Sequence, residues 1–436
     1  MSFILEKIRR QTARILLYVK ALCKWILVSA IVGILCGFLG SAFHIGVSKA
    51  TSLRLTYPWL LWGFPLAGIL IVFLYRVFQV EGHSTNSIIT EVQSGKGLKF
   101  GLIPAIFCST ILTHLCGGSA GREGAALQMG GTIGFEVGRL LKLDDRDLRT
   151  ATMAGMAAFF SALFGTPLAA TIFAMAVISI GLLYHAALIP CLIAALISYA
   201  ISLLVGIAPT HFFVQIPVLS PLLFLKVSIL AGLCAAVSCF FCDVLHRAER
   251  FMRQVFPNAI LRVLVGSVFL ILLSLLFPSG DYNGAGTDVI ARAVEGGTTV
   301  PPAFLLKILF TVITLSAGFK GGEVVPCFFI GATFGCAVGP FLGIPPGAAA
   351  AIGLISVFCA ATNCPIASTF LAIELFGSEG MLLYALSCAV CYVLSGYDGL
   401  YSSQRILYDK LKARYIDVHT NAYHEGDHTP MEQKYR

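Results

Sequence analysis

The chain has 436 residues, of which 57% are hydrophobic and only 12% are charged, and its 30 lysines and arginines outnumber 22 acids to give a formal net charge of +8. Soluble proteins carry about 25% charged residues, so this composition excludes a water-soluble globular fold and indicates an all-α polytopic membrane protein. The residue alternation that marks a transmembrane barrel is absent. Six long, nearly uncharged stretches are candidates for membrane helices: 25–46, 59–75, 153–207, 222–241, 259–277 and 345–375.

The first segment of the chain, residues 1–21, is strongly basic and precedes the first apolar stretch. No short apolar run ending in a small-residue cleavage site follows Lys24, so we expect an uncleaved helix at the membrane interface and not a signal peptide. Lysines and arginines also gather near the C-terminus. Because cytoplasmic segments beside membrane spans are rich in these residues, both ends are predicted to lie in the cytoplasm, with the protein in the plasma (inner) membrane and in contact with lipid. The charge distribution does not indicate a nucleic-acid partner.

Two glycine-rich turns that each carry a glutamate, 117–124 and 318–326, lie far apart in the sequence. Each opens a helix-like run that ends in a similar tag, Gly-Gly-Thr-Ile-Gly at 130–134 and Gly-Ala-Thr-Phe-Gly at 331–335. The same parts recur in the same order, which predicts two homologous transmembrane halves. These predicted halves are residues 22–206 and 220–395. The sequence alone leaves open whether the halves run parallel or inverted.

A glutamate in the first glycine-rich turn, Glu123, is the first candidate for function. A helix that starts at mid-membrane depth presents unpaired N–H groups and the positive end of its dipole, so two such starts facing each other would form an anion site inside the bilayer. The Glu123 carboxylate can fill that site while ionised and leave it when protonated, which would make it both a gate and a proton carrier. The alternative is a helix N-terminal acid paired with Arg122.

Glu323 stands at the equivalent point of the second turn. Pro326 suits the first turn of a helix, where no N–H bond is lost, so a helix is expected to begin here. A second acid at the matching end of the repeat favours a role in proton transfer. The alternative is an ion pair with Lys320 at a wet membrane surface.

A third helix start is expected at 82–87, because Ser, Thr and Asn are favoured N-cap residues. His83 beside them could titrate near neutrality. Capping alone would explain Ser84, and the alternative for His83 is a surface residue.

The segment Gly117-Gly118-Ser119-Ala120-Gly121 also matches the G-x-S-x-G elbow of hydrolases, which requires a preceding strand. Residues 102–116 before it read as a membrane helix, so an intramembrane serine hydrolase is only a remote alternative. We expect a secondary active transporter and not an enzyme.

Two further features have open interpretations. Glu374 has no acid counterpart in the first half, and it either supports the loop beside the second turn or faces interfacial water. The chain has 14 cysteines, including C-x-x-C pairs at 239–242 and 388–391. These pairs lack convincing histidine partners, so we interpret them as small helix-packing residues.

At these turns the chain resembles the CLC family of anion channels and proton-coupled anion exchangers. Gly121-Arg122-Glu123-Gly124 is similar to the family's G-[KR]-E-G-P signature, with Ala125 in place of proline. Residues 322–326 fall on its G-x-F-x-P signature, and Leu400-Tyr401-Ser402 resembles the segment that supplies an anion-site tyrosine. The turn at 82–86 falls where the family has G-S-G-I-P. The resemblance implies that the anion is bound by Gly121, Gly124, Gly322, Val324, Val325, Tyr401, His83 and Ser84, beside Glu123 and Glu323 as gate and proton carriers.

The resemblance also implies a fold of about 17–18 tilted, partly re-entrant helices in two inverted repeats. It implies a terminal helix over 396–415 that carries Tyr401, and a cytoplasmic tail over 416–436. A homodimer with one pathway per subunit and no cofactor is expected on the same ground.

Departures from the usual signatures are similar to one branch of this family, the bacterial fluoride/proton antiporters. These departures are the Glu323 carboxylate in the second signature, the string Gly-Arg-Glu-Gly-Ala-Ala-Leu-Gln-Met-Gly at 121–130, and the loss of G-S-G-I-P. Conventional exchangers have an inner proton glutamate where this chain has Val177, and Val325 stands where the fluoride branch often has threonine. The resemblance therefore predicts fluoride export in exchange for protons. A chloride/proton exchanger or a passive chloride channel of the same fold is the alternative.

Overall fold

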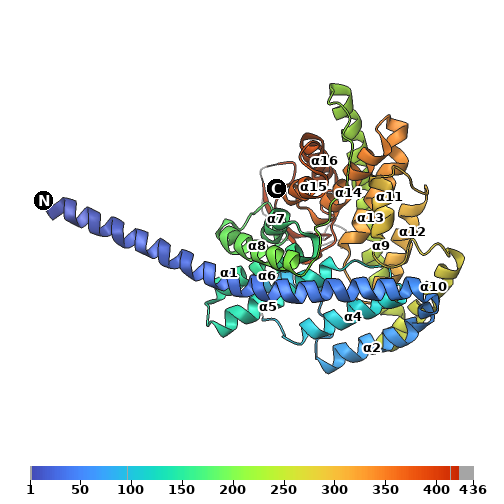
Figure 1. Ribbon diagram of the computed structural model, residues 1–436, viewed down its shortest axis with the longest axis horizontal. Helices are drawn as coiled ribbons and strands as arrows, with labels where there is room; N and C mark the ends of the chain where they lie inside the picture. Colours follow the sequence, from blue (N-terminus) through green and yellow to red (C-terminus); the bar gives the residue numbers. More distant parts are fainter. Residues whose placement is uncertain (1, 96, 413, 422–436) are drawn as a thin grey trace, which may run out of the picture.

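The computed structural model describes residues 2–95, 97–412 and 414–421, and these residues form 16 α-helices, three short 3-10 helices and a three-stranded sheet (Figure 1). The first eight helices are α1 Ser2–Thr56, α2 Phe64–Val77, α3 Thr85–Ser94, α4 Leu102–Cys116, α5 Glu123–Leu140, α6 Asp145–Phe164, α7 Pro167–Ala176 and α8 Leu188–Leu204. The next eight are α9 Pro221–Val255, α10 Ala259–Leu276, α11 Thr287–Val294, α12 Ala303–Ala317, α13 Val324–Val338, α14 Pro346–Thr362, α15 Pro365–Phe376 and α16 Met381–Leu394. The 3-10 helices are η1 Pro58–Gly63, η2 His185–Ala187 and η3 Gly339–Leu342.

This fold contains both helices of membrane-spanning length and shorter apolar helices. Among the described residues, six helical segments are long and apolar enough to cross a membrane by length and composition. Six further apolar helices have only 10–17 residues. A helix that short leaves its end groups inside the membrane, which is tolerated only where protein surrounds them. The partly re-entrant helices expected from the sequence are thus present, although the described residues contain 16 α-helices where about 17–18 were expected.

Helix α1 continues without a break from the basic segment into the membrane. Its 55 residues make it about 80 Å long, and its N-terminal part projects from the body at the left of Figure 1. The sequence predicts a separate interfacial helix over 1–21, and the structure differs because no glycine or proline occurs between Ser2 and Val32 to end a helix there.

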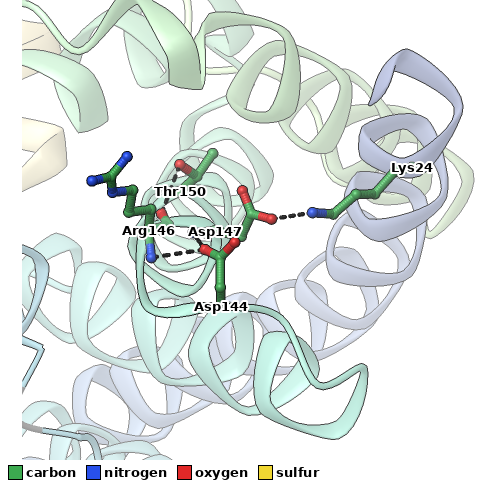
Figure 2. A network of polar contacts seen from close by, with 5 residues as sticks. All are labelled: Lys24, Asp144, Arg146, Asp147 and Thr150. Carbon is green, nitrogen blue, oxygen red and sulfur yellow. Dashed lines mark hydrogen bonds and ion pairs between the residues drawn. The ribbon is translucent and has the colours of Figure 1, made fainter. Parts of the chain in front are cut away.

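The start of α6 is tied to α1 by a small polar network (Figure 2). Asp144 caps α6, because its carboxylate accepts hydrogen bonds from the amides of Asp147 at 2.9 Å and Arg146 at 3.0 Å. The Asp147 carboxylate in turn forms an ion pair with Lys24 of α1. Lys24, in the first half of α1, therefore lies beside the first turn of α6.

We predict that Asp144→Ala lowers the thermal midpoint because it removes the α6 cap. The amides of Asp147 and Arg146 hold the pKa of Asp144 below its usual range, so the cap stabilises the fold above the pKa of an unfolded aspartate, about 3.9. This contribution disappears as the pH falls through the lower folded pKa, so the difference from wild type should shrink between about pH 7 and about pH 3. Scanning fluorimetry of purified protein measures it, with the exposed Asp145→Ala as control. A pH-independent difference would contradict the prediction.

The order of elements from α4 to α7 recurs from α12 to α15. Helices α4 and α12 both have 15 residues, and both end at a glycine with positive φ, +93° at Gly117 and +108° at Gly318. Helices α7 and α15 both begin with a proline, Pro167 and Pro365. The repeated parts seen in the sequence thus correspond to repeated helices.

The two Gly-x-x-x-Gly tags bring neighbouring helices into backbone contact. A Cβ built on Gly130 of α5 would lie 2.2 Å from the Gly155 carbonyl oxygen of α6. In the second half, a Cβ on Gly331 of α13 would lie 2.3 Å from the Gly353 oxygen of α14. Since no side chain fits at these distances, the tags are close-packing contacts, and α5–α6 and α13–α14 are equivalent pairs.

Helices α7 and α15 form a hydrogen-bonded contact between the two halves. The Glu374 carboxylate of α15 accepts hydrogen bonds from the amides of Leu168 at 3.0 Å and Ala169 at 2.9 Å, in the first turn of α7. This acid therefore satisfies unpaired N–H groups of the other half's helix start. The sequence analysis gave two interpretations of Glu374, support of the loop beside the second turn or exposure to interfacial water. The observed contact is support of a neighbouring segment, but that segment is α7 and not the loop beside the second turn.

The prediction of a terminal helix over 396–415 is wrong. After α16 the chain turns through Tyr401 into strand β2, Arg405–Tyr408, which pairs in parallel with β1, Ser179–Ile180, and antiparallel with β3, Tyr415–His419. The paired residues are Ile180 with Ile406 and Ile406 with Val418. The β-branched and aromatic residues of this segment favour strands, and β1 supplies an edge to pair with. Of the tail predicted over 416–436, residues 422–436 lie outside the described residues.

Candidate functional site

The two glycine-rich turns meet at the centre of the molecule. The Gly121 amide donates to the Gly322 carbonyl at 2.7 Å, and the Gly322 amide donates to the Gly121 carbonyl at 2.7 Å. These bonds form an isolated antiparallel bridge, which we call the Gly121–Gly322 bridge. Helix α5 begins two residues after Gly121, and α13 begins two residues after Gly322. Both helix starts therefore lie beside one bridge, as the sequence predicts for a shared anion site.

The Glu123 side chain is fully buried and folds back toward the bridge. Its Oε2 accepts a hydrogen bond from the Arg122 amide at 2.9 Å, and its Oε1 lies 3.6 Å from Arg122 Nε. The Val325 amide in the first turn of α13 also faces this carboxylate. A Cβ built on Gly121 would lie 2.5 Å from Glu123 Oε2 and 3.1 Å from the Val325 nitrogen. The Glu123 carboxylate of the first half thus lies against the start of α13 in the second half. The ion pair with Arg122, which the sequence analysis gave as the alternative, is present at the same time.

Glu323 makes the reciprocal contact with the start of α5. A Cβ built on Gly124 would lie 3.0 Å from Glu323 Oε2 and 3.3 Å from Thr85 Oγ1. Glu249 and Lys320 also act on Glu323 electrostatically, and so does Glu123. Lys320 Nζ itself lies 4.4 Å from the centre of the Tyr75 ring. Each glutamate therefore reaches the helix start of the other half, and the two acids share one small region.

Tyr401 is 2% exposed although no regular helix or strand holds it. The Leu400 amide donates to the Ala361 carbonyl at 2.8 Å, and the Gln404 amide donates to the Tyr401 carbonyl at 2.9 Å. Gln404 Nε2 then donates to the carbonyls of Val177 and Thr362, each at 3.0 Å. Glu323 and Glu123 are both among the charged groups that act on the Tyr401 hydroxyl. The loop before β2 therefore positions Tyr401, a role that the sequence analysis assigned to a helix.

The sequence-predicted residues of the two signatures are all buried around the bridge: Gly121, Gly124, Gly322, Val324 and Val325. The valine side chains are apolar and the amides of Gly121 and Gly322 are used in the bridge, so the donors that remain are the backbone N–H groups of Gly124, Val324 and Val325. Backbone amides at a helix start suit an anion and do not suit a cation. Among the described residues no cluster of histidine, cysteine and acidic side chains could hold a metal ion.

The turn before α3 contributes a residue that the sequence analysis missed. Ser84 is exposed and forms a capping box with Ser87, while His83 Nδ1 lies 3.4 Å from the Glu81 carbonyl oxygen. Thr85 is 5% exposed, and its Oγ1 accepts a hydrogen bond from Gln128 Nε2 at 3.2 Å. Thr85 is thus the hydroxyl of this turn that reaches Gly124. Thr85 directly follows the N-cap residue Ser84. The run of N-cap residues is the only feature of the sequence that could have indicated its role.

Several polar atoms around the bridge lack hydrogen-bond partners. Within residues 2–95, 97–412 and 414–421, these include Oε1 of Glu123, Oε2 of Glu323, the Tyr401 hydroxyl and Oε1 of Gln128. Buried polar atoms are normally paired, so such a group of atoms marks a place for a polar ligand or a proton. A carboxyl group that gains a proton also gains a donor.

Ser119 is not placed as a hydrolase nucleophile. The segment before it is helix α4, and its buried hydroxyl lies 2.9 Å from Thr311 Oγ1. His114 Nε2 lies 3.5 Å from the Gly121 carbonyl oxygen and contacts no serine in any hydrogen bond of the described chain. The strand-to-helix elbow is therefore absent at this position.

The 14 cysteines are all free. Cys391 of one C-x-x-C pair donates to the Ala231 carbonyl at 2.9 Å, between α16 and α9. The contact is one of helix packing, as expected.

We predict that Gly322→Ala separates the two helix starts. A Cβ at this position would lie 2.4 Å from the Gly124 nitrogen and 2.9 Å from the Glu123 nitrogen, and overpacking of this kind costs about 1–3 kcal/mol. A lower thermal midpoint and loss of anion flux in liposomes are the expected results. Gly232→Ala in α9 is the matched control, since its Cβ would meet only Leu394 Cδ1, at 3.3 Å. Wild-type flux in Gly322→Ala would refute the close contact.

The fold and the paired helix starts define a multi-pass membrane protein of the anion-transport class. The sequence model of the family described as voltage gated chloride channel matches residues 67–396, so the chain belongs to this family, the CLC family. It is an anion/proton exchanger or channel of that family.

Individual relatives agree with this assignment. The chain is 33% identical over 398 residues to a chloride/fluoride channel protein of Pseudomonas syringae pv. tomato, covering 89% of this chain and 88% of the relative. The crystal structure of a CLC-type fluoride/proton antiporter superposes with a TM-score of 0.84 at 34% identity, covering 88% of this chain and 98% of that one. A slow cyanobacterial Cl⁻/H⁺ antiporter shares the fold, with a TM-score of 0.74 at 19% identity, covering 85% of this chain and 94% of that one.

Proposed function

We propose that this protein exports fluoride in exchange for protons across the plasma (inner) membrane, with both termini in the cytoplasm. The observation that carries the proposal is the reciprocal placement of two carboxylates at the two helix starts beside the Gly121–Gly322 bridge. The names of a chloride/fluoride channel relative and of a structurally similar fluoride/proton antiporter support it. A homodimer with one pathway per subunit, in contact with lipid and without a cofactor, is part of the same proposal.

Fluoride is small and strongly hydrated, so a fluoride site must replace its water with dense hydrogen-bond donors. The amides of Gly124, Val324 and Val325 and the Tyr401 hydroxyl are the donors available beside the bridge. The Glu123 carboxylate takes hydrogen bonds at the same place, so it competes with the anion while ionised. Protonation removes that competition, because a neutral carboxyl group gains little from a helix start.

Glu323 serves as the second proton site in this mechanism. Its free Oε2 lies beside Gly124, and a protonated Glu323 would donate a hydrogen bond to an anion held there. Val177 is buried at the end of α7, where conventional exchangers have a glutamate, so a proton has no carboxylate to use at that point. Lys320 and Glu249 on the other side of Glu323 provide a polar surface through which it can exchange protons.

We predict that Glu123→Gln abolishes proton coupling, because the amide cannot take up a proton or compete as an anion. Fluoride flux should stop or become passive. Electrode-recorded fluoride efflux from liposomes, with and without a pH gradient, measures both outcomes. Glu374→Gln, an acid far from the bridge in sequence and bound to α7, is the matched control. Coupled transport at the wild-type rate in Glu123→Gln would exclude its gating role.

We predict that Glu323→Ala reduces the preference for fluoride over chloride by about tenfold or more, since a hydrogen bond to a charged group contributes about 1.5–3 kcal/mol. Proton coupling should be lost as well. Parallel efflux measurements with fluoride-selective and chloride-selective electrodes give the selectivity ratio. If both selectivity and coupling survive, the fluoride assignment loses its main support.

The second candidate is a chloride/proton exchanger or a passive chloride channel. It is favoured by Val325, whose side chain offers no hydroxyl where the fluoride branch often has threonine. Equal efflux of fluoride and chloride from wild-type liposomes would establish this candidate. A pH gradient that drives chloride uphill would separate the exchanger from the channel.

A further inference from the structure

A group of buried cationic and amide side chains lies next to the Gly121–Gly322 bridge and takes no part in the mechanism above. It consists of Arg54 at the end of α1, His114 of α4, Lys307 of α12, and Asn283 in the loop between α10 and α11, and we call it the cationic cluster. His114 is 1% exposed and Lys307 is fully buried. Asn283 Nδ2 donates to the Gly117 carbonyl at 3.0 Å, which fixes the loop against the first glycine-rich turn.

The cationic cluster and the charged neighbours of Glu323 lie on opposite sides of the bridge. Helix α10 begins near Arg262, which lies close to Gly318, and its 18 residues run about 27 Å before the loop that holds Asn283. Helix α1 gives the same orientation, since about 45 Å of helix separates Lys24, paired near the start of α6, from Arg54. The cluster therefore lies near the end of α1 that is opposite its basic N-terminal segment.

Two nitrogen atoms of the cluster surround a free space beside Gly284. A Cβ built on this glycine would lie 3.5 Å from Arg54 Nη2 and 3.9 Å from His114 Nδ1, and apart from its chain neighbours no other heavy atom comes within 4 Å. Arg54 Nε and His114 Nδ1 have no hydrogen-bond partner in the described part of the chain. Buried nitrogen donors are normally satisfied, so these atoms point to a ligand that accepts hydrogen bonds.

The positive charge of the cluster is not balanced locally. Lys307 Nζ donates to the carbonyls of Gly284 at 2.7 Å and Tyr282 at 3.3 Å, which are neutral groups. Asp281 in the same loop pairs with Arg292 at 2.5 Å. Among the described residues no carboxylate forms an ion pair with Arg54 or Lys307. The Arg54 guanidinium, which has no counterion in that part of the chain, attracts anions.

We propose that Arg54, His114 and the backbone at Gly284 form a second binding site for a small monovalent anion such as a halide, separate from the Gly121–Gly322 bridge. The proposal rests on the transport function proposed above. Arg54 supplies the charge and guanidinium donors, His114 supplies Nδ1–H when that nitrogen carries hydrogen, and Lys307 holds Gly284 in place through its hydrogen bond to the Gly284 carbonyl. Glycine is required at 284 because a side chain would occupy the space of the ion.

The position of this second site makes it the last or first stop of an anion on its way past the bridge. His114 connects the two places, since its Nε2 lies 3.5 Å from the Gly121 carbonyl oxygen while its Nδ1 faces Gly284. An anion held there is partly dehydrated before it meets the helix starts. The site would thus set the apparent affinity for anions arriving from the side opposite the basic N-terminal segment.

Titration calorimetry of the purified full chain with sodium fluoride, and separately with sodium chloride, tests the second site without any need for transport. Arg54→Gln should weaken one binding event by about tenfold or more, because it removes a charged hydrogen-bond donor. Arg54→Lys should restore part of the affinity. Wild-type binding in Arg54→Gln would overturn the proposal.

A pair of alanine variants tests the space itself. Gly284 and Gly280 belong to the same loop and have similar positive φ values, +63° and +71°, so an alanine strains both alike. A Cβ at 280 meets nothing within 4 Å, whereas a Cβ at 284 fills the space between Arg54 and His114. Gly284→Ala should lose the binding event that Arg54→Gln weakens, and Gly280→Ala should keep it. Equal affinities in the two variants would overturn the proposal whatever the effect of Arg54→Gln.

The same titrations separate this site from the proposed function. Glu323→Ala should alter the other binding event and leave the event that depends on Arg54 unchanged. If wild-type protein moved no halide in liposomes, the proposed function would fail while the calorimetric comparison would still decide the second site. A single binding event that Glu323→Ala alters and Gly284→Ala leaves unchanged would overturn the second site and leave the proposed function standing.

Discussion

Two backbone hydrogen bonds between Gly121 and Gly322 fix the geometry of the whole site. They hold the turns of the two halves at 2.7 Å, and glycine is needed at both positions because a Cβ at 322 would lie 2.4 Å from the Gly124 nitrogen and a Cβ at 121 would lie 2.5 Å from Glu123 Oε2. Helices α5 and α13 then start within two residues of the contact, so the positive ends of their dipoles converge. The Gly-x-x-x-Gly contacts behind each helix serve the same end, because they place α5 on α6 and α13 on α14 at backbone distance.

Converging helix starts explain why two acids can be buried together. A lone carboxylate in the interior is costly, and two adjacent ones repel each other. Here Glu123 faces the Val325 amide of the opposite half, Glu323 lies close to Gly124 at the start of α5, and the Arg122 guanidinium adds a positive charge. The helix starts thus offset part of the cost of both charges. Protons and anions can compensate the remainder, which is the physical basis of the coupling proposed above.

The features that could be read from the sequence are those set by local chemistry. The apolar composition predicted the class of protein, and the paired glycine-glutamate turns predicted which segments would meet, because both repeats carry the same backbone requirements. The sequence did not show which distant segments pair with each other in the folded chain. Residues after Tyr401 form β2 because β1 of the first half offers an edge, so the helix predicted over 396–415 is absent. Ser84 caps its own helix, and Thr85 reaches Gly124 because of how α3 is oriented against α5.

The bridge also limits how the protein can move. Rocking one half against the other would break both bonds and leave four buried backbone groups unpaired, at about 1–3 kcal/mol for each. A cheaper motion is rotation of Glu123, Glu323 and Tyr401 about their own single bonds, which breaks neither backbone bond. The anion and these side chains would then exchange positions beside the Gly121–Gly322 bridge while the backbone of both halves stays fixed.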